Sequence, residues 1–161
     1  RIWSVPLATS GEVGQPRGRL MDFDTVLLIG RIIFSVMFIG SGVGHLMDTE
    51  GSTAYAESKG LGSNSKLLVQ LSGVFLAAGG VAVLLGIWAD LAFLLLAVLV
   101  LIMGFTMHAF WKETDEQASQ TEMALFMKNL TIAGGALMAS AIYGAGGGFN
   151  DAVLVDNIGL W

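Results

Sequence analysis

Cysteine is absent from the 161-residue sequence. Its absence excludes disulfides, thiolate metal sites and cysteine nucleophiles, so any redox role requires a bound cofactor or the thiols of a partner. Charged residues are also scarce, at 13% of the chain, against about 25% in soluble domains. The Lys and Arg residues form no cluster and the formal net charge is −5. We therefore expect no nucleic-acid partner.

Apolar residues are present in excess, at 54% of the chain with a mean hydropathy of +0.71. They form four long stretches, at residues 25–47, 66–88, 91–111 and 122–146. Each is close to the ~20 residues that an α-helix needs to cross the hydrocarbon layer, and backbone groups in lipid must be hydrogen-bonded within their own segment. The sequence predicts an all-α fold, a four-helix transmembrane bundle, rather than buried helices of a soluble protein.

The remaining segments divide the chain. Residues 1–24 form a polar N-terminal extension that lacks the apolar core of a signal peptide. Residues 25–146 form the four-span transmembrane domain, and residues 147–161 form a C-terminal tail. In the first and longest connection, Thr53 can cap the start of a short extra helix and Gly60 can end it. The acidic KETDEQASQT between the last two spans is expected to be a solvated connector.

Four crossings place both termini on one side of the membrane. If Arg31 and Lys128 within the spans are left out, the other Lys and Arg residues are divided equally between the two sides, with three on each, so the positive-inside rule decides little. Arg31, near the start of the first span, favours cytoplasmic termini. This residue is expected to snorkel to the interface, or to pair with a lipid phosphate or an internal carboxylate.

Polar side chains of several segments converge on the membrane face opposite the termini. The gathered residues are His45, Tyr55, Glu57, His108, Lys128 and Asn129. Charges within spans often mark function, and these residues, together with Arg31, are the candidate polar pocket. The two imidazoles would hold a metal or haem, or hydrogen-bond a quinone carbonyl, and Lys128 would bind an anionic headgroup. The alternative is structural hydrogen bonding, with both His residues at the water boundary and Lys128 snorkelling.

Glycines within the spans are expected to let the helices approach one another closely. The candidates for this packing are Gly40, Gly44, Gly79, Gly80 and Gly135. No catalytic constellation is evident in the sequence. We expect no metal site, because the two His residues lack a third ligand, and no catalysis by this chain alone. No cofactor is evident beyond a bound quinone or lipid.

A series of motifs in one order resembles the DoxX family of small four-span membrane proteins. The motifs are GRIIFSVMFIGSGVGHLMD, AYAESKGL, GGVAVLLGIWADLA, FTMHAFW and FMKNLTIAGGAL. The resemblance covers residues 28–143. It departs from the family pattern in two places: His45 stands where the family has a Lys, and apolar residues 75–78 stand where it has a Glu before Gly79. An activity that depends on that Glu is therefore in doubt for this chain.

The resemblance implies an integral protein of the prokaryotic plasma (inner) membrane. Family members are linked to oxidoreductase assemblies, including an archaeal thiosulfate:quinone oxidoreductase and a mycobacterial complex with superoxide dismutase and a sulfurtransferase. Three functions follow as expectations: an accessory subunit of a redox- or respiration-linked membrane complex, a quinone-interacting oxidoreductase subunit, or a small-molecule transporter. The expected partners are membrane lipids and either other membrane subunits or further copies of the chain.

Overall fold

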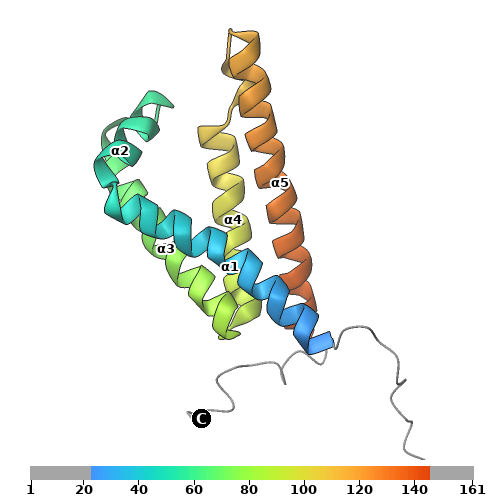
Figure 1. Ribbon diagram of the computed structural model, residues 1–161. Coiled ribbons are helices and arrows are strands. Elements are labelled where there is room, and N and C mark those ends of the chain that lie inside the picture. The colour runs from blue at the N-terminus through green and yellow to red at the C-terminus, as the bar shows by residue number, and fades with distance from the viewer. Residues whose placement is uncertain (1–22, 146–161) are drawn as a thin grey trace, which may run out of the picture.

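The computed structural model describes residues 23–145, and every regular element within this range is helical (Figure 1). The elements are α1 (Phe23–Met47), α2 (Thr49–Ser58), the 3-10 turn η1 (Gly62–Asn64), α3 (Ser65–Leu85), α4 (Ala89–Met107), the 3-10 turn η2 (Phe110–Lys112) and α5 (Glu116–Gly144). Helices α1, α3, α4 and α5 are long and apolar enough to cross a membrane. The predicted all-α class, with four spans and a short extra helix after the first, is confirmed. The predicted tail at 147–161 and nearly all of the extension at 1–24 lie outside the described residues.

The spans form two antiparallel pairs (Figure 1). Helix α1 packs along α3, and α4 packs along α5, while α3 and α4 join the two pairs. Within the described residues, α1 and α5 make no extended contact, so the bundle is open on that side. The start of α1, the α3–α4 turn and the end of α5 lie together at what we call the hairpin end. The end of α1, α2, both 3-10 turns and the start of α5 form the α2 end.

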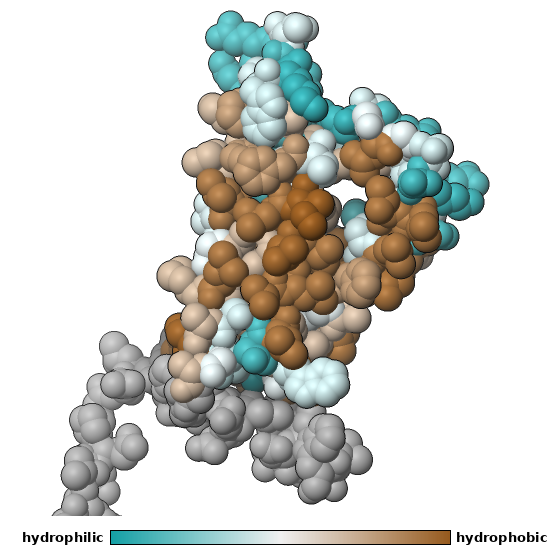
Figure 2. All heavy atoms as spheres, turned by 180° about the vertical axis from the view of Figure 1, so that it is seen from behind, coloured by the Kyte–Doolittle hydropathy of each residue, from teal (hydrophilic) through white to brown (hydrophobic). Residues whose placement is uncertain are grey.

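The core lies where α3 and α4 join the two pairs. Phe38, Leu76, Val83 and Leu96 are almost completely buried there. The outward faces carry large exposed apolar side chains on all four spans, and Figure 2 shows them covering the middle of the molecule while hydrophilic side chains gather at the α2 end. This distribution suits a protein whose outer surface faces lipid.

Glycines on α1 and α3 set how closely these helices pack. A Cβ on Gly42 would lie 2.5 Å from the backbone N of Ala77, so the two helices touch here through their backbones. Gly79 and Gly80 also face close neighbours, because a Cβ on either residue would come within 2.9 Å of a side-chain atom on another helix. Such contacts are typical of membrane helices that associate through small residues.

The expectation for the other three glycines is wrong. A Cβ on Gly40, Gly44 or Gly135 would have no atom within 4 Å, so these residues do not bring the four spans together. Spacing of small residues shows that they share a helix face, but it does not show which face turns toward a neighbour. In α1 the face that packs on α3 carries Gly42 instead.

Arg31 is buried and joins α1 to α3 at the hairpin end. Its Nε donates to the carbonyl oxygen of Val83 at 2.8 Å, and its Nη2 donates to that of Leu84 at 2.6 Å. These carbonyls belong to the last turn of α3, where a helix lacks partners for its C=O groups and carries negative partial charge. The side chain is only 3% exposed, so the structure does not show the expected snorkelling.

Side-chain caps set the true starts of two helices. Asp48 accepts a hydrogen bond from the backbone N of Gly51, and α2 therefore begins four residues before Thr53. Asp115 accepts from the backbone N of Ala118 at 2.8 Å, so α5 begins at Glu116. Most of the stretch expected to be a solvated connector is thus the first part of α5. The predicted starts of these two helices were wrong, because the caps lie in polar stretches outside the apolar pattern.

Candidate functional site

Four ionisable side chains form a connected cluster at the α2 end. The Lys59 Nζ lies 2.5 Å from Oε1 of Glu122 and 3.2 Å from Oε1 of Glu113. The Nδ1 of His108 lies 2.8 Å from the other carboxylate oxygen of Glu122, Oε2. Glu122 therefore bridges a lysine and a histidine through its two oxygens. We call these four residues the ionic cluster.

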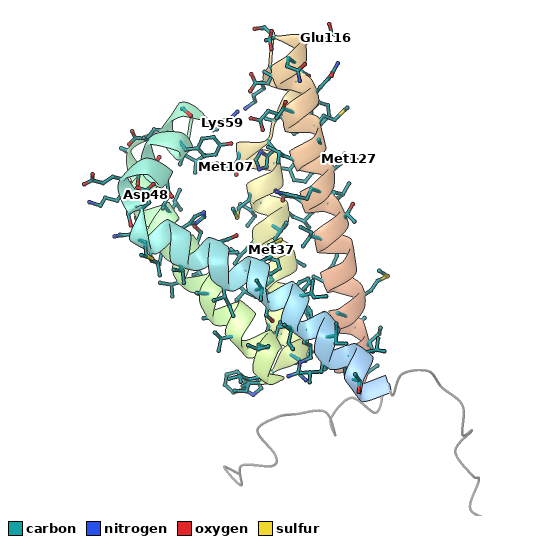
Figure 3. The ribbon with its side chains drawn as sticks, in the orientation of Figure 1. Met37, Asp48, Lys59, Met107, Glu116 and Met127 are labelled. Carbon is teal, nitrogen blue, oxygen red and sulfur yellow. The ribbon has the colours of Figure 1, made fainter. Side chains whose placement is uncertain are left out.

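Each member comes from the end of a different element. Lys59 caps the C-terminus of α2, and His108 caps the C-terminus of α4 through its backbone N–H. Glu122 lies near the second turn of α5, and Glu113 follows η2. Figure 3 shows the labelled Lys59 between α2 and the start of α5. Because α2 makes no extended contact with α4 or α5 in the described part of the chain, the cluster is a polar link between the two helix pairs.

The cluster is sheltered from water without being fully buried. The side chain of Glu122 is 12% exposed, that of His108 13% and that of Lys59 20%. The hydrogen bond to Glu122 raises the pKa of the Lys59 ammonium above its ordinary value. Burial raises the pKa of the nearby Tyr55, and the negative charge of Glu122 raises it further. Both Lys59 and Tyr55 are therefore protonated at neutral pH.

Four aromatic rings of α4, η2 and α5 pack together in the same segments that carry His108, Glu113 and Glu122. The ring of Phe126 lies 5.1 Å from that of Phe105, and 5.7 Å from those of both Phe110 and Trp111, all in edge-to-face arrangements. Edge-to-face pairs are a favourable geometry for aromatic rings. Trp111 is 52% exposed. A tryptophan near the end of a membrane span is typical of the aromatic belt at a membrane interface. An exposed tryptophan is also typical of protein interfaces.

Tyr55 lies beside the cluster, but His45 has a different partner. The Lys59 Nζ lies 5.9 Å from the centre of the half-exposed Tyr55 ring, within cation–π distance. The Nδ1 of His45 lies 2.9 Å from Oγ of Ser72, in the interface between α1 and α3. The two histidines are thus at the same end of the molecule but contribute to separate contacts.

Lys128 and Asn129 are neighbours in sequence that face in different directions. Lys128 is exposed on the outer face of α5, whereas Asn129 is buried and packs against Gly104 of α4. Arg31, also a member of the predicted pocket, lies at the opposite hairpin end. Of the predicted site residues, the structure therefore brings only Tyr55 and His108 together.

Three cluster residues were absent from the predicted pocket: Lys59, Glu113 and Glu122. The topology that placed His108 at this end also places Lys59 and Glu122 there. Opposite charges on segments that meet at a sheltered end tend to pair, and this signal could have identified Lys59 and Glu122. Nothing comparable distinguishes Glu113 from the other acidic residues near the start of α5.

The DoxX family model matches residues 26–109, from α1 to just beyond the end of α4. The chain belongs to the DoxX family. This DoxX protein is also 32% identical over 124 residues to the Inner membrane protein YqjF of Escherichia coli (strain K12), an alignment that covers 76% of this chain and 87% of that protein. No solved structure matches the chain. Glu113 and Glu122 lie beyond the residues that the family model matches.

Proposed function

We propose that this DoxX protein is an accessory subunit of a larger, redox-linked complex in the inner membrane, and that the α2 end is where it meets its partner. The observation that carries the proposal is the ionic cluster. Its acidic and basic groups pair with one another and hold the segments of this end in place. Charged groups that bind one another hold the surrounding surface in a fixed shape. The charged groups of a catalytic centre would instead point toward a substrate.

The surface beside the cluster has the composition of a protein interface. Trp111 and Phe105 are more than half exposed, and Tyr55 is 44% exposed. Tryptophan and tyrosine are enriched at interfaces and supply most of the residues with large effects on binding. The redox link rests on the family resemblance, and the inner-membrane location is supported by the name of the Escherichia coli relative.

Two tryptophans at opposite ends of the molecule allow a matched test. Tagged wild-type protein, Trp111→Ala and Trp88→Ala are extracted from native membranes in mild detergent, and co-purifying proteins are quantified by mass spectrometry. Trp88 is 73% exposed at the hairpin end and serves as the control. We expect wild type and Trp88→Ala to recover the same membrane proteins, and Trp111→Ala to lose them at least tenfold, as for a central interface tryptophan. Recovery of no protein above an untagged control would overturn the proposal.

The His108–Glu122 pair favours a second function, interaction with a quinone. Nδ1–H donates to Glu122 and orients the ring, and in the doubly protonated ring Nε2–H would donate to a quinone carbonyl. A partner protein would supply the electrons, and His108 would supply a proton to the carbonyl oxygen. If replacing both His45 and His108 with Ala leaves quinone reduction in membranes unchanged, this alternative is excluded.

A further inference from the structure

The two helix pairs meet at the hairpin end and diverge toward the α2 end (Figure 1). Near the hairpin end Gly79 of α3 faces Leu96 of α4, since a Cβ on the glycine would lie 2.9 Å from the leucine side chain. Ala56 of α2 and Val69 of α3 are buried nearer the α2 end, but they do not belong to the core cluster. Figure 2 shows an opening between the two pairs near the α2 end. The apolar contact that joins the pairs is therefore concentrated toward the hairpin end.

Lys59 bridges the two pairs at the α2 end. Helix α2 packs on α3, so Lys59 belongs with the α1–α3 pair, whereas Glu113 and Glu122 belong with the α4–α5 pair. Within residues 23–145, every side-chain hydrogen bond that crosses between the pairs at this end is donated by the Nζ of Lys59. The contacts of His45 and His108 each stay within one pair. One ammonium group thus holds the two pairs together here.

The separation of the pairs at this end is opposed mainly by these polar contacts. Lipid tails are as apolar as the helix faces, so parting two apolar faces in a membrane carries no hydrophobic cost. The side chains of Lys59 and Glu113 are 20% and 31% exposed. Water therefore reaches the bridge and can replace its contacts when the pairs part.

The chain passes from one pair to the other once, in the turn at residues 86–88. Gly86 ends α3 with φ 78°, and Trp88 precedes α4 with φ 43°. A left-handed backbone at a tryptophan costs energy, because its Cβ crowds the following carbonyl oxygen. Residues at the ends of helices commonly absorb the change in backbone angles when two rigid bodies rotate. The Trp88 side chain is 73% exposed, so no tight packing prevents such a change at this residue.

We propose that the two helix pairs are rigid bodies that rotate about the α3–α4 turn, and that Lys59 is the latch that keeps the α2 end closed. Release of Lys59 from Glu113 and Glu122 widens the opening between the pairs. Each pair stays intact, because Arg31 ties α1 to the end of α3 and Ser140 of α5 donates to the carbonyl oxygen of Asp90 on α4 at 2.8 Å. The latch does not depend on the accessory role proposed above.

Two pairs of spin labels distinguish rotation from general loosening. The chain has no cysteine, so introduced cysteines are the only labelling sites. Ala54→Cys on α2 and Ala124→Cys on α5, both exposed, report the distance across the α2 end. Ile29→Cys on α1 and Ile142→Cys on α5, also exposed, report the distance across the hairpin end. Both distances are measured by double electron–electron resonance in lipid nanodiscs.

Lys59→Met releases the latch while keeping a long side chain, and Glu122→Gln weakens it from the other side. Lys66→Met is the matched control, because Lys66 is an exposed lysine at the start of α3 with no salt bridge within the described part of the chain. Lys59→Arg keeps the positive charge and should restore the closed arrangement.

We expect Lys59→Met to lengthen the α2-end distance by at least about 5 Å, the rise of one helical turn, and Glu122→Gln to lengthen it less. The hairpin-end distance should stay as in wild type in both variants, and both distances should be unchanged in Lys66→Met and Lys59→Arg. An unchanged α2-end distance in Lys59→Met would overturn the latch. Equal lengthening at both ends would show that the pairs come apart without rotating, and would overturn the hinge.

Discussion

Glu122 provides the sharpest test of how the α2 end is held together. Replacing Glu122 with Gln keeps the shape of the side chain and removes the charge that Lys59 and His108 share. Hydrogen bonds to charged groups contribute about 1.5–3 kcal/mol each, but these side chains are 12–20% exposed and water weakens the interaction. Since Gln can still hydrogen-bond to one neighbour, we expect a loss of about 2 kcal/mol in the free energy of unfolding.

A double-mutant cycle isolates the pairwise part of this loss. Glu122→Gln, Lys59→Met and the double variant are unfolded in a mixed-detergent titration followed by circular dichroism. Direct partners should be coupled by about 1 kcal/mol, so the double variant should lose less stability than the sum of the single variants. Glu57→Gln, at an exposed position of α2, is the control and should melt like wild type. Additivity within about 0.3 kcal/mol would refute the link across the two helix pairs.

Three further predictions concern Arg31, Gly42 and the titration of Lys59. Arg31→Lys should cost about 2 kcal/mol, because an ammonium cannot reproduce the planar, two-nitrogen contact with the end of α3; the detergent unfolding midpoint measures it. Gly42→Ala should prevent stable folding, because its Cβ would lie 2.5 Å from the backbone of α3, whereas Gly44→Ala should be tolerated, because its Cβ would meet no atom within 4 Å. Expression level and gel filtration measure this difference. The raised pKa of Lys59 means that its contribution to stability is complete below about pH 10.4, its unfolded value, and is lost as the pH rises through the higher folded value. Melting temperatures of wild type and Lys59→Met should therefore differ by a constant amount from pH 7 to 10 and converge above it.

The number of spans could be predicted from sequence because each apolar run is long enough to require a crossing. The starts of α2 and α5 could not, since they depend on the capping residues Asp48 and Asp115 in polar stretches. Each of these two helices therefore begins at least one turn before the start that the apolar pattern predicts. The structure places His45, Tyr55 and His108 at the α2 end, as four alternating crossings predict, whereas Arg31 lies at the opposite end.

What the sequence does not determine is the rotation of each helix. Lys128 and Asn129 are adjacent, yet one is exposed and the other buried, because successive residues of a helix point about 100° apart. An amphipathic stripe would normally reveal the inward face, but these spans are apolar on every side. The same ambiguity explains why the spacing of small residues in α1 predicts Gly40 and Gly44 at the contact, whereas the structure has Gly42 there.

The central claim, that the chain works as a subunit of a larger complex, is tested most directly by the mass of the intact particle. Tagged wild-type protein is extracted gently from its own membranes and measured by native mass spectrometry, with bound components released stepwise. The account predicts a particle of fixed stoichiometry that contains this chain together with redox proteins. A lone chain, or a particle made only of copies of it, would contradict the account.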